Sequence, residues 1–183
     1  MASRDRAELD IDGTLFSFPD GWDVEVFDKW PQYDSVKSWG AKGCDVLVFA
    51  QSMLWIIEVK DYTYPNANQP EDLPRTVGLK ALNTMGLLYA LQRNLADSAA
   101  SQFARSSAMS ETINLVLHIE VKDGGRKGRQ VKSLLAPLRQ KLGKTQKALG
   151  LSKSFVTSNL DPHPNVPWTT RRDPATRLIH EDR

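Results

Sequence analysis

The chain has 183 residues, 40% of them hydrophobic and 25% charged, and a formal net charge of +2, which predicts one globular domain with a sizeable core. No apolar run is long enough to span a membrane, and the N-terminal MASRDRAELD is too charged for a signal peptide, so no membrane association is expected. The single cysteine, Cys44, excludes an intramolecular disulfide and indicates the reducing cytoplasm, and the scattered histidines give no zinc spacing.

The first 41 residues are predicted to contain two short strands. Residues 14–18 and 23–27 are rich in strand-forming side chains, and the Pro-Asp-Gly sequence between them is typical of a turn. Four aromatic residues in this region are expected to belong to the core and its cover rather than to a base-stacking platform: Trp22, Trp30, Tyr33 and Trp39.

The most informative stretch is KGCDVLVFAQSMLWIIEVKDY, residues 42–62. Two apolar runs of strand length, residues 44–50 and 54–59, flank the polar pair Gln51-Ser52, and this pattern predicts a β-hairpin.

The hairpin brings polar side chains together if its turn closes with Ala50 opposite Met53. Asp45 then lies directly opposite Glu58, with Cβ atoms about 5 Å apart on one face. Lys60 points the same way as Glu58, because side chains alternate along a strand. A register slipped by one residue would place Asp45 on the other face.

Two carboxylates this close repel each other unless a cation lies between them. Mg²⁺ prefers oxygen ligands, typically one or two carboxylates with water and substrate phosphate. The main-chain carbonyl of Val59 is a further candidate ligand, and Lys60 would orient or deprotonate a water or offset charge on a phosphate. Together, Asp45, Glu58, Val59 and Lys60 predict metal-assisted phosphodiester hydrolysis.

Asp45 followed on the next strand by Glu58-Val59-Lys60 resembles the signature of the PD-(D/E)xK nuclease superfamily. The resemblance implies a restriction-endonuclease-like core, Mg²⁺ or Mn²⁺ as cofactor, Asp45 and Glu58 as metal ligands, and Lys60 as the catalytic lysine. The sequence departs from the motif at Cys44, which stands where the motif has proline.

Two open points accompany this motif. Members of the superfamily often carry a further acid upstream, and Glu25 is the candidate, with Asp28 and Asp34 behind it; Glu25 also fits the solvated face of an edge strand. Charged residues at a strand end are often a solvated pair, or the remnant of an inactive site, although an aspartate inside an apolar run is harder to explain in this way.

Residues 75–107 are predicted to be largely helical, with a break near Asn94 or Asp97. Lys80 falls on a different face from the leucines and is interpreted as a surface lysine rather than a phosphate contact. The predicted apolar face recurs at threes and fours: Leu79, Leu82, Met85, Leu88, Leu91 and Leu95.

Residues 112–121, TINLVLHIEV, are the next strong strand. Because the strand follows a helix, it is expected to pair parallel to the strand that carries Lys60, through a right-handed crossover. The predicted fold class is therefore α/β, with a mixed central β-sheet flanked by helices.

The C-terminal third is strongly basic. Residues 1–61 carry a charge of −6, residues 62–121 carry −1 and residues 122–183 carry +9. Three cations of a glycine-rich loop, Arg126, Lys127 and Arg129, are expected to bind a nucleic-acid backbone. The alternative is a solvated basic helix with a loose tail.

A helix with an apolar stripe from Val131 to Leu142, interrupted or kinked at Pro137, and a strand at residues 153–158 complete the predicted elements. Residues 1–160 are predicted to form the nuclease domain, and residues 161–183 a basic, proline-containing tail that wraps or is disordered.

The sequence thus predicts a cytoplasmic, Mg²⁺-dependent nuclease, most simply a deoxyribonuclease, acting in restriction, repair or antiviral defence. With no separate sequence-reading module in the chain, specificity is expected to come from a homodimer or from a partner protein that delivers or activates it. The alternatives are a catalytically inactive nuclease-like fold that serves as a nucleic-acid-binding or scaffold subunit, and a plain nucleic-acid-binding module.

Overall fold

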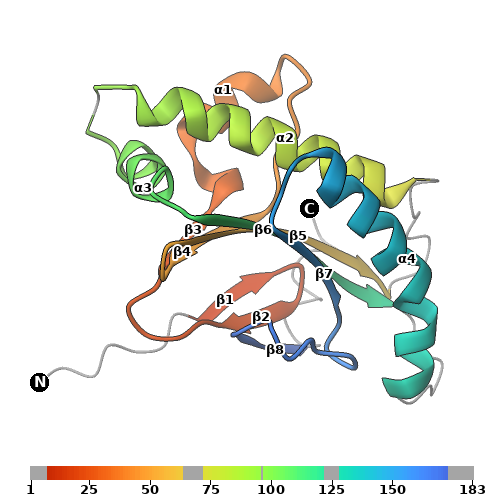
Figure 1. Ribbon diagram of the computed structural model, residues 1–183. Coiled ribbons are helices and arrows are strands. Elements are labelled where there is room, and N and C mark those ends of the chain that lie inside the picture. The colour runs from red at the N-terminus through yellow and green to blue at the C-terminus, as the bar shows by residue number, and fades with distance from the viewer. Residues whose placement is uncertain (1–7, 64–71, 96, 122–127, 173–183) are drawn as a thin grey trace, which may run out of the picture.

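The structure is a computed structural model that describes residues 8–63, 72–95, 97–121 and 128–172 (Figure 1). Its elements, in chain order, are β1 (Glu8–Ile11), β2 (Thr14–Ser17), β3 (Asp23–Val26), the 3-10 helix η1 (Phe27–Lys29), α1 (Pro31–Lys37), β4 (Val46–Ala50), β5 (Met53–Tyr62), α2 (Leu73–Gln92), α3 (Ala99–Ser107), β6 (Thr112–Val121), α4 (Gly128–Ala148), β7 (Lys153–Thr157) and β8 (Thr169–Arg172).

The predicted α/β class is confirmed. A five-stranded mixed sheet has the order β3-β4-β5-β6-β7, in which β3, β4 and β5 pair antiparallel and β5, β6 and β7 pair parallel. The four α-helices lie on one side of this sheet, and a smaller antiparallel sheet of order β1-β2-β8 lies on the other (Figure 1). The central sheet is therefore covered on both faces, by helices on one and by strands on the other.

The β4–β5 hairpin has the predicted register. Ala50 pairs with Met53, and the two turn residues Gln51 and Ser52 have φ angles of 51° and 58°. Positive φ at both central positions is the mark of the type I′ turn, whose twist matches that of the strands. The Asp45 main-chain N–H donates to the Ile57 carbonyl at 3.0 Å, so the pairing extends one residue beyond β4.

Both faces of the central strands are buried, which explains their long apolar runs. Leu47, Ile56 and Leu117 face the helices, and the alternate residues Val48 and Ile57 face the small sheet; each is 0% exposed. Strand β6 has the predicted bounds and pairs parallel to β5 as expected.

The predicted apolar face of α2 is wrong in part. Leu88 and Leu91 are buried, but Leu79 and Leu82 are 54% and 50% exposed, and Leu95, which lies beyond the end of the helix, is 99% exposed. The helix instead buries a narrower set of residues, several of them small, which lets it approach α4 closely at Gly78: Leu73, Pro74, Val77, Gly78, Ala81, Thr84, Leu88 and Leu91.

Two glycines of α2 offer a matched test of this packing. A Cβ at residue 78 would lie 2.4 Å from the Thr145 Cγ2 of α4, whereas a Cβ at residue 86 meets no atom within 4 Å. Gly78→Ala is therefore expected to lower the free energy of unfolding by about 1–3 kcal/mol, and Gly86→Ala to raise it by up to about 1 kcal/mol because alanine favours the helix. Urea denaturation measures both; equal changes would contradict the α2–α4 contact.

The predicted tail is folded as far as residue 172. Its last four described residues form β8, which pairs antiparallel with β2. Arg172 Nη2 donates to Asp61 Oδ2 at 2.8 Å and to Thr63 Oγ1 at 2.9 Å, which ties β8 to the end of β5. The domain boundary predicted at residue 160 thus falls within the folded part of the chain.

The remaining predicted elements are largely confirmed. Strands β2 and β3 occupy the predicted ranges but belong to different sheets, and β7 matches the predicted last strand. Trp30 and Tyr33 are buried as expected, whereas Trp39 is exposed. Helix α4 continues through Pro137. None of the helices in the described part of the chain has the length and apolarity that crossing a bilayer requires.

Candidate active site

Asp45, Glu58 and Lys60 come together near the C-terminal end of β5, on the face that the helices cover. Glu58 and Lys60 are two residues apart on β5, and Asp45 immediately precedes β4 in the hairpin register described above. The sequence-predicted trio is therefore one cluster.

The loop that leads to Asp45 is fixed by contacts with three other elements. The Gly43 N–H donates to the Tyr33 hydroxyl at 2.8 Å, and the Cys44 N–H donates to Thr84 Oγ1 of α2 at 2.9 Å. Proline lacks an N–H and could not make the second bond, which gives a physical reason for Cys44 at the motif's proline position. The Phe27 N–H donates to the Asp45 carbonyl at 3.0 Å.

The Asp45 carboxylate is held against the neighbouring strand. Its Oδ2 accepts a 2.6 Å hydrogen bond from the main-chain N–H of Val59, and its Oδ1 lies 3.9 Å from Lys80 Nζ. The Asp45 side chain is 16% exposed, so one edge of the carboxylate reaches the surface. Val59 therefore positions a predicted metal ligand through its N–H.

Glu58 is the centre of the cluster and is completely buried. Its Oε1 lies 2.6 Å from Lys60 Nζ and 2.6 Å from Lys80 Nζ, so two ammonium groups share one oxygen. Its Oε2 is buried and has no hydrogen-bond partner among the described residues. A buried carboxylate oxygen without a hydrogen bond lowers stability, and a bound ion or water would satisfy it.

Burial raises the pKa of Glu58 from 4.5 to about 7, and the Asp45 charge adds to this, while Lys80 and Lys60 act in the opposite direction. Burial alone would lower the pKa of each lysine, but Glu58 and Asp45 more than offset it, so both lysine pKa values are raised. Both ammonium groups are therefore charged at neutral pH. Asp12, in the β1–β2 turn, also raises the pKa of Lys60.

Lys80 is the member of the cluster that sequence reasoning missed. It was assigned to the surface, yet its side chain is only 16% exposed and binds the buried Glu58. A signal was present: Lys80 is the one charged residue between Arg75 and Arg93, and it shares its helical face with Val77, three residues before it, and Thr84, four residues after it. The leucine spacing indicated a different buried face of the helix. Part of that face is exposed, and the face that carries Lys80 is buried instead.

Glu25 does not join the cluster as the expected further acid. Its Oε2 accepts a hydrogen bond from Trp30 Nε1 at 3.0 Å, so the side chain anchors the start of α1. Asp28 is the upstream acid that interacts with the cluster, because its pKa is raised by burial and by the charge of Asp45. Among the described residues, no three acidic, histidine or cysteine side chains form a group that could hold a metal.

The predicted phosphate-binding cations are only partly described. Arg126 and Lys127 lie outside the described residues. Arg129 is exposed in the first turn of α4. Four further exposed cations follow on α4: Lys132, Lys141, Lys144 and Lys147.

The residues present fit a hard divalent cation through oxygen ligands. Within the described part of the chain the Glu58 Oε2 has no partner, the Asp45 Oδ1 faces the same lysine as Glu58, and the Val59 carbonyl follows Glu58 directly along the chain. Two carboxylates with a main-chain carbonyl leave the other ligand positions to water or substrate.

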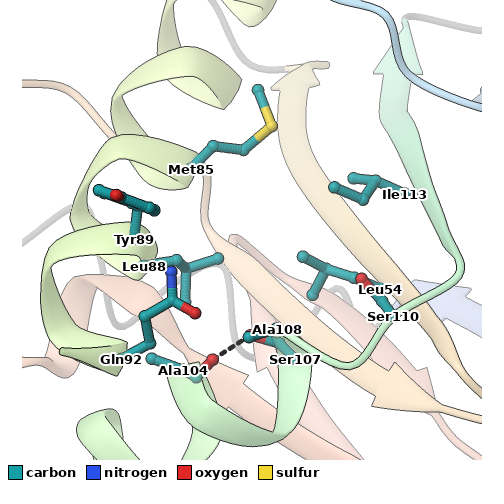
Figure 2. Close-up of a pocket in the computed structure, with 10 residues that line it drawn as sticks. All are labelled: Leu54, Met85, Leu88, Tyr89, Gln92, Ala104, Ser107, Ala108, Ser110 and Ile113. Carbon is teal, nitrogen blue, oxygen red and sulfur yellow. Dashed lines mark hydrogen bonds between the residues drawn. The ribbon is translucent and has the colours of Figure 1, made fainter.

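A separate hollow of about 230 Å³ lies at the other end of the sheet (Figure 2). Leu54 and Ile113, near the start of β5 and β6, form its floor, and Met85, Leu88 and Tyr89 of α2 form one wall. It is mostly apolar and its lining includes no acidic or basic side chain. This hollow therefore offers no charged group for acid–base or metal chemistry.

Comparisons with known proteins give one distant likeness. No family model matches the chain, and no solved structure matches it. The cysteine–tRNA ligase of Neisseria meningitidis serogroup A is 24% identical over 211 aligned positions, which cover 91% of this chain and 30% of the ligase. The chain thus spans less than a third of that relative, and the likeness is too distant to show a family.

Proposed function

We propose that the chain is a cytoplasmic, metal-dependent nuclease that hydrolyses nucleic-acid phosphodiester bonds, with DNA as the first substrate to test. The observation that carries this proposal is the buried Glu58, which shares one oxygen between Lys60 and Lys80 and lies beside Asp45, while its other oxygen has no partner in the part of the chain that the structure describes. So many ionisable groups at one buried point are costly for stability and are typical of catalytic sites.

A bound Mg²⁺ or Mn²⁺ would supply Lewis acidity at the phosphate and a more acidic water. Asp45 and Glu58 would hold the ion, with Asp45 kept in place by the Val59 N–H. Lys60 is kept protonated by Glu58, so its role is to orient the attacking water and to offset charge that develops on the phosphate.

The exposed cations of α4 support a polyanionic substrate. Arg129, Lys132 and Lys141 lie on a helix with no acidic residue from 128 to 148. Contacts of this kind bind phosphates without reading sequence. Specificity is then supplied by a second copy or by a partner protein, in a setting such as restriction, repair or antiviral defence.

The test is cleavage by the purified chain of supercoiled DNA, linear DNA and tRNA, with Mg²⁺, Mn²⁺ or EDTA. Transfer RNA is included because the distant relative is named for it. Metal-dependent cleavage is expected, and Lys60→Ala is expected to slow it by about a hundredfold or more, through loss of a charge at the reacting phosphate.

The absence of cleavage with either metal would instead favour the inactive, nuclease-like scaffold. Nucleic-acid binding that falls steeply with salt and is unchanged in Lys60→Ala, without any cleavage, would indicate a plain binding module.

A further inference from the structure

Lys80 makes a contact that Lys60 does not. Its Nζ lies 2.6 Å from Glu58 Oε1 and 3.9 Å from Asp45 Oδ1, so it bridges the two carboxylates. Lys60 forms an ion pair with Glu58. Among the ion pairs of the described residues, Lys80 is the one cation that contacts both Asp45 and Glu58.

The cluster is already electrically balanced without an added ion. Asp45 and Glu58 together carry two negative charges when ionised, and Lys60 and Lys80 carry two positive charges. A divalent ion bound by the same two carboxylates would lie within a few ångströms of the Lys80 ammonium. Like charges at such distances repel each other, and the Lys80 ammonium contacts the same two carboxylates that would bind the ion, so the two cations compete for them.

The ammonium group of Lys80 can move away from the two carboxylates while its backbone stays in place. Its backbone is fixed in the middle of α2, where its carbonyl accepts a hydrogen bond from Thr84 Oγ1 at 2.9 Å. Its ammonium, however, stands at the end of a flexible four-carbon stem and is not fully enclosed, with 16% of the side chain exposed. Rotation about the stem can move the charge outward without moving the helix.

We infer that the Lys80 ammonium is the resident cation of the metal-free site, and that a divalent ion binds by displacing it. Lys80 then sets the metal concentration at which the site fills. This inference rests on the proposed metal-dependent function, and it assigns to α2 a regulatory part in a site otherwise built by the β4–β5 hairpin.

The test is Mn²⁺ binding at pH 8.5, measured by calorimetry and by the electron paramagnetic resonance of free Mn²⁺. Lys80→Met keeps the length of the side chain and removes its charge, and is expected to bind Mn²⁺ at least about tenfold more tightly than the wild type. The matched control, Lys60→Met, removes a charge that touches Glu58 alone and is expected to tighten binding less. Lys80→Arg retains the charge and is expected to bind no more tightly than the wild type.

Thermal unfolding gives a second readout, because Mn²⁺ would not restore the stability lost with a merely structural ion pair. Lys80→Met is expected to melt below the wild type in EDTA, because the carboxylates lose a counter-ion, and to recover with Mn²⁺. A loss that Mn²⁺ does not restore would overturn the inference.

The inference is also overturned if Lys80→Met binds Mn²⁺ no better than the wild type or Lys60→Met, or if none of these proteins binds Mn²⁺ at millimolar concentration. Failure of the proposed function gives a different result: Mn²⁺ binding that follows the expected order in a protein that cleaves no nucleic acid.

Discussion

Glu58→Gln is expected to reduce metal-dependent cleavage by about a thousandfold or more while the protein remains folded. Glutamine has nearly the same shape but no negative charge, and Glu58 is the carboxylate that both lysines and the proposed ion share. The measurement is the single-turnover cleavage rate at saturating Mg²⁺, with circular dichroism to confirm the fold.

The matched control for Glu58→Gln is Glu25→Gln. Glu25 lies on β3 and accepts a hydrogen bond from Trp30, which glutamine can also accept through its carbonyl oxygen. Cleavage by Glu25→Gln is therefore expected to stay within about twofold of the wild type. Equal losses in the two variants would show that general charge, and not the Glu58 cluster, sustains the reaction.

The hairpin and its trio could be predicted because the signals are local. Strand length, a two-residue turn and the period of two fix which side chains of neighbouring strands meet, and Ala50 opposite Met53 then determines that Asp45 faces Glu58. No information from distant parts of the chain is needed for this step.

Lys80 could not be found in the same way, because its role depends on which face of α2 packs on the sheet. Leucine spacing indicated one face, but close packing against α4 selected the face with Gly78, Ala81 and Thr84. Close helix packing of this kind places small residues on the buried face and leaves leucines outside, a choice that periodicity alone does not encode.

Strand β8 of the small sheet could not be predicted from local sequence either. Strand β8 is a short run containing two arginines, Thr169–Arg172, with no apolar alternation to mark it. Its place depends on pairing with β2, more than 150 residues earlier in the chain, and on the Arg172–Asp61 ion pair at 2.8 Å. Arg171 and Arg172 were therefore assigned to a tail, although they are part of a strand that completes the small sheet.

Cleavage at limiting Mg²⁺ is expected to rise about tenfold per pH unit up to about pH 7 and then to level off. Only ionised Glu58 binds a cation, and burial, with the Asp45 charge, raises its pKa to about 7. Since the same group has a pKa of 4.5 when solvated, ionising it in the metal-free protein costs about 3 kcal/mol more than in water. Below pH 7 a proton therefore competes with the metal.

The sign of the accompanying stability change follows from the same pKa. Between pH 4.5 and about 7 the folded protein keeps a proton on Glu58 that the unfolded chain has released, so this group's contribution to stability falls as the pH rises through that window. Glu58→Gln is expected to flatten that fall in metal-free urea titrations.

Saturating metal separates the two effects. Because the ion binds the ionised carboxylate, high Mg²⁺ is expected to move the midpoint of the pH–rate profile below pH 7. Lys80→Met removes a cation that stabilises ionised Glu58, so in the metal-free protein it is expected to move the pH midpoint of the stability change above pH 7. A rate profile with its midpoint near 4.5 at every Mg²⁺ concentration would mean that Glu58 titrates as a solvated carboxyl, and would remove the buried carboxylate from the reaction.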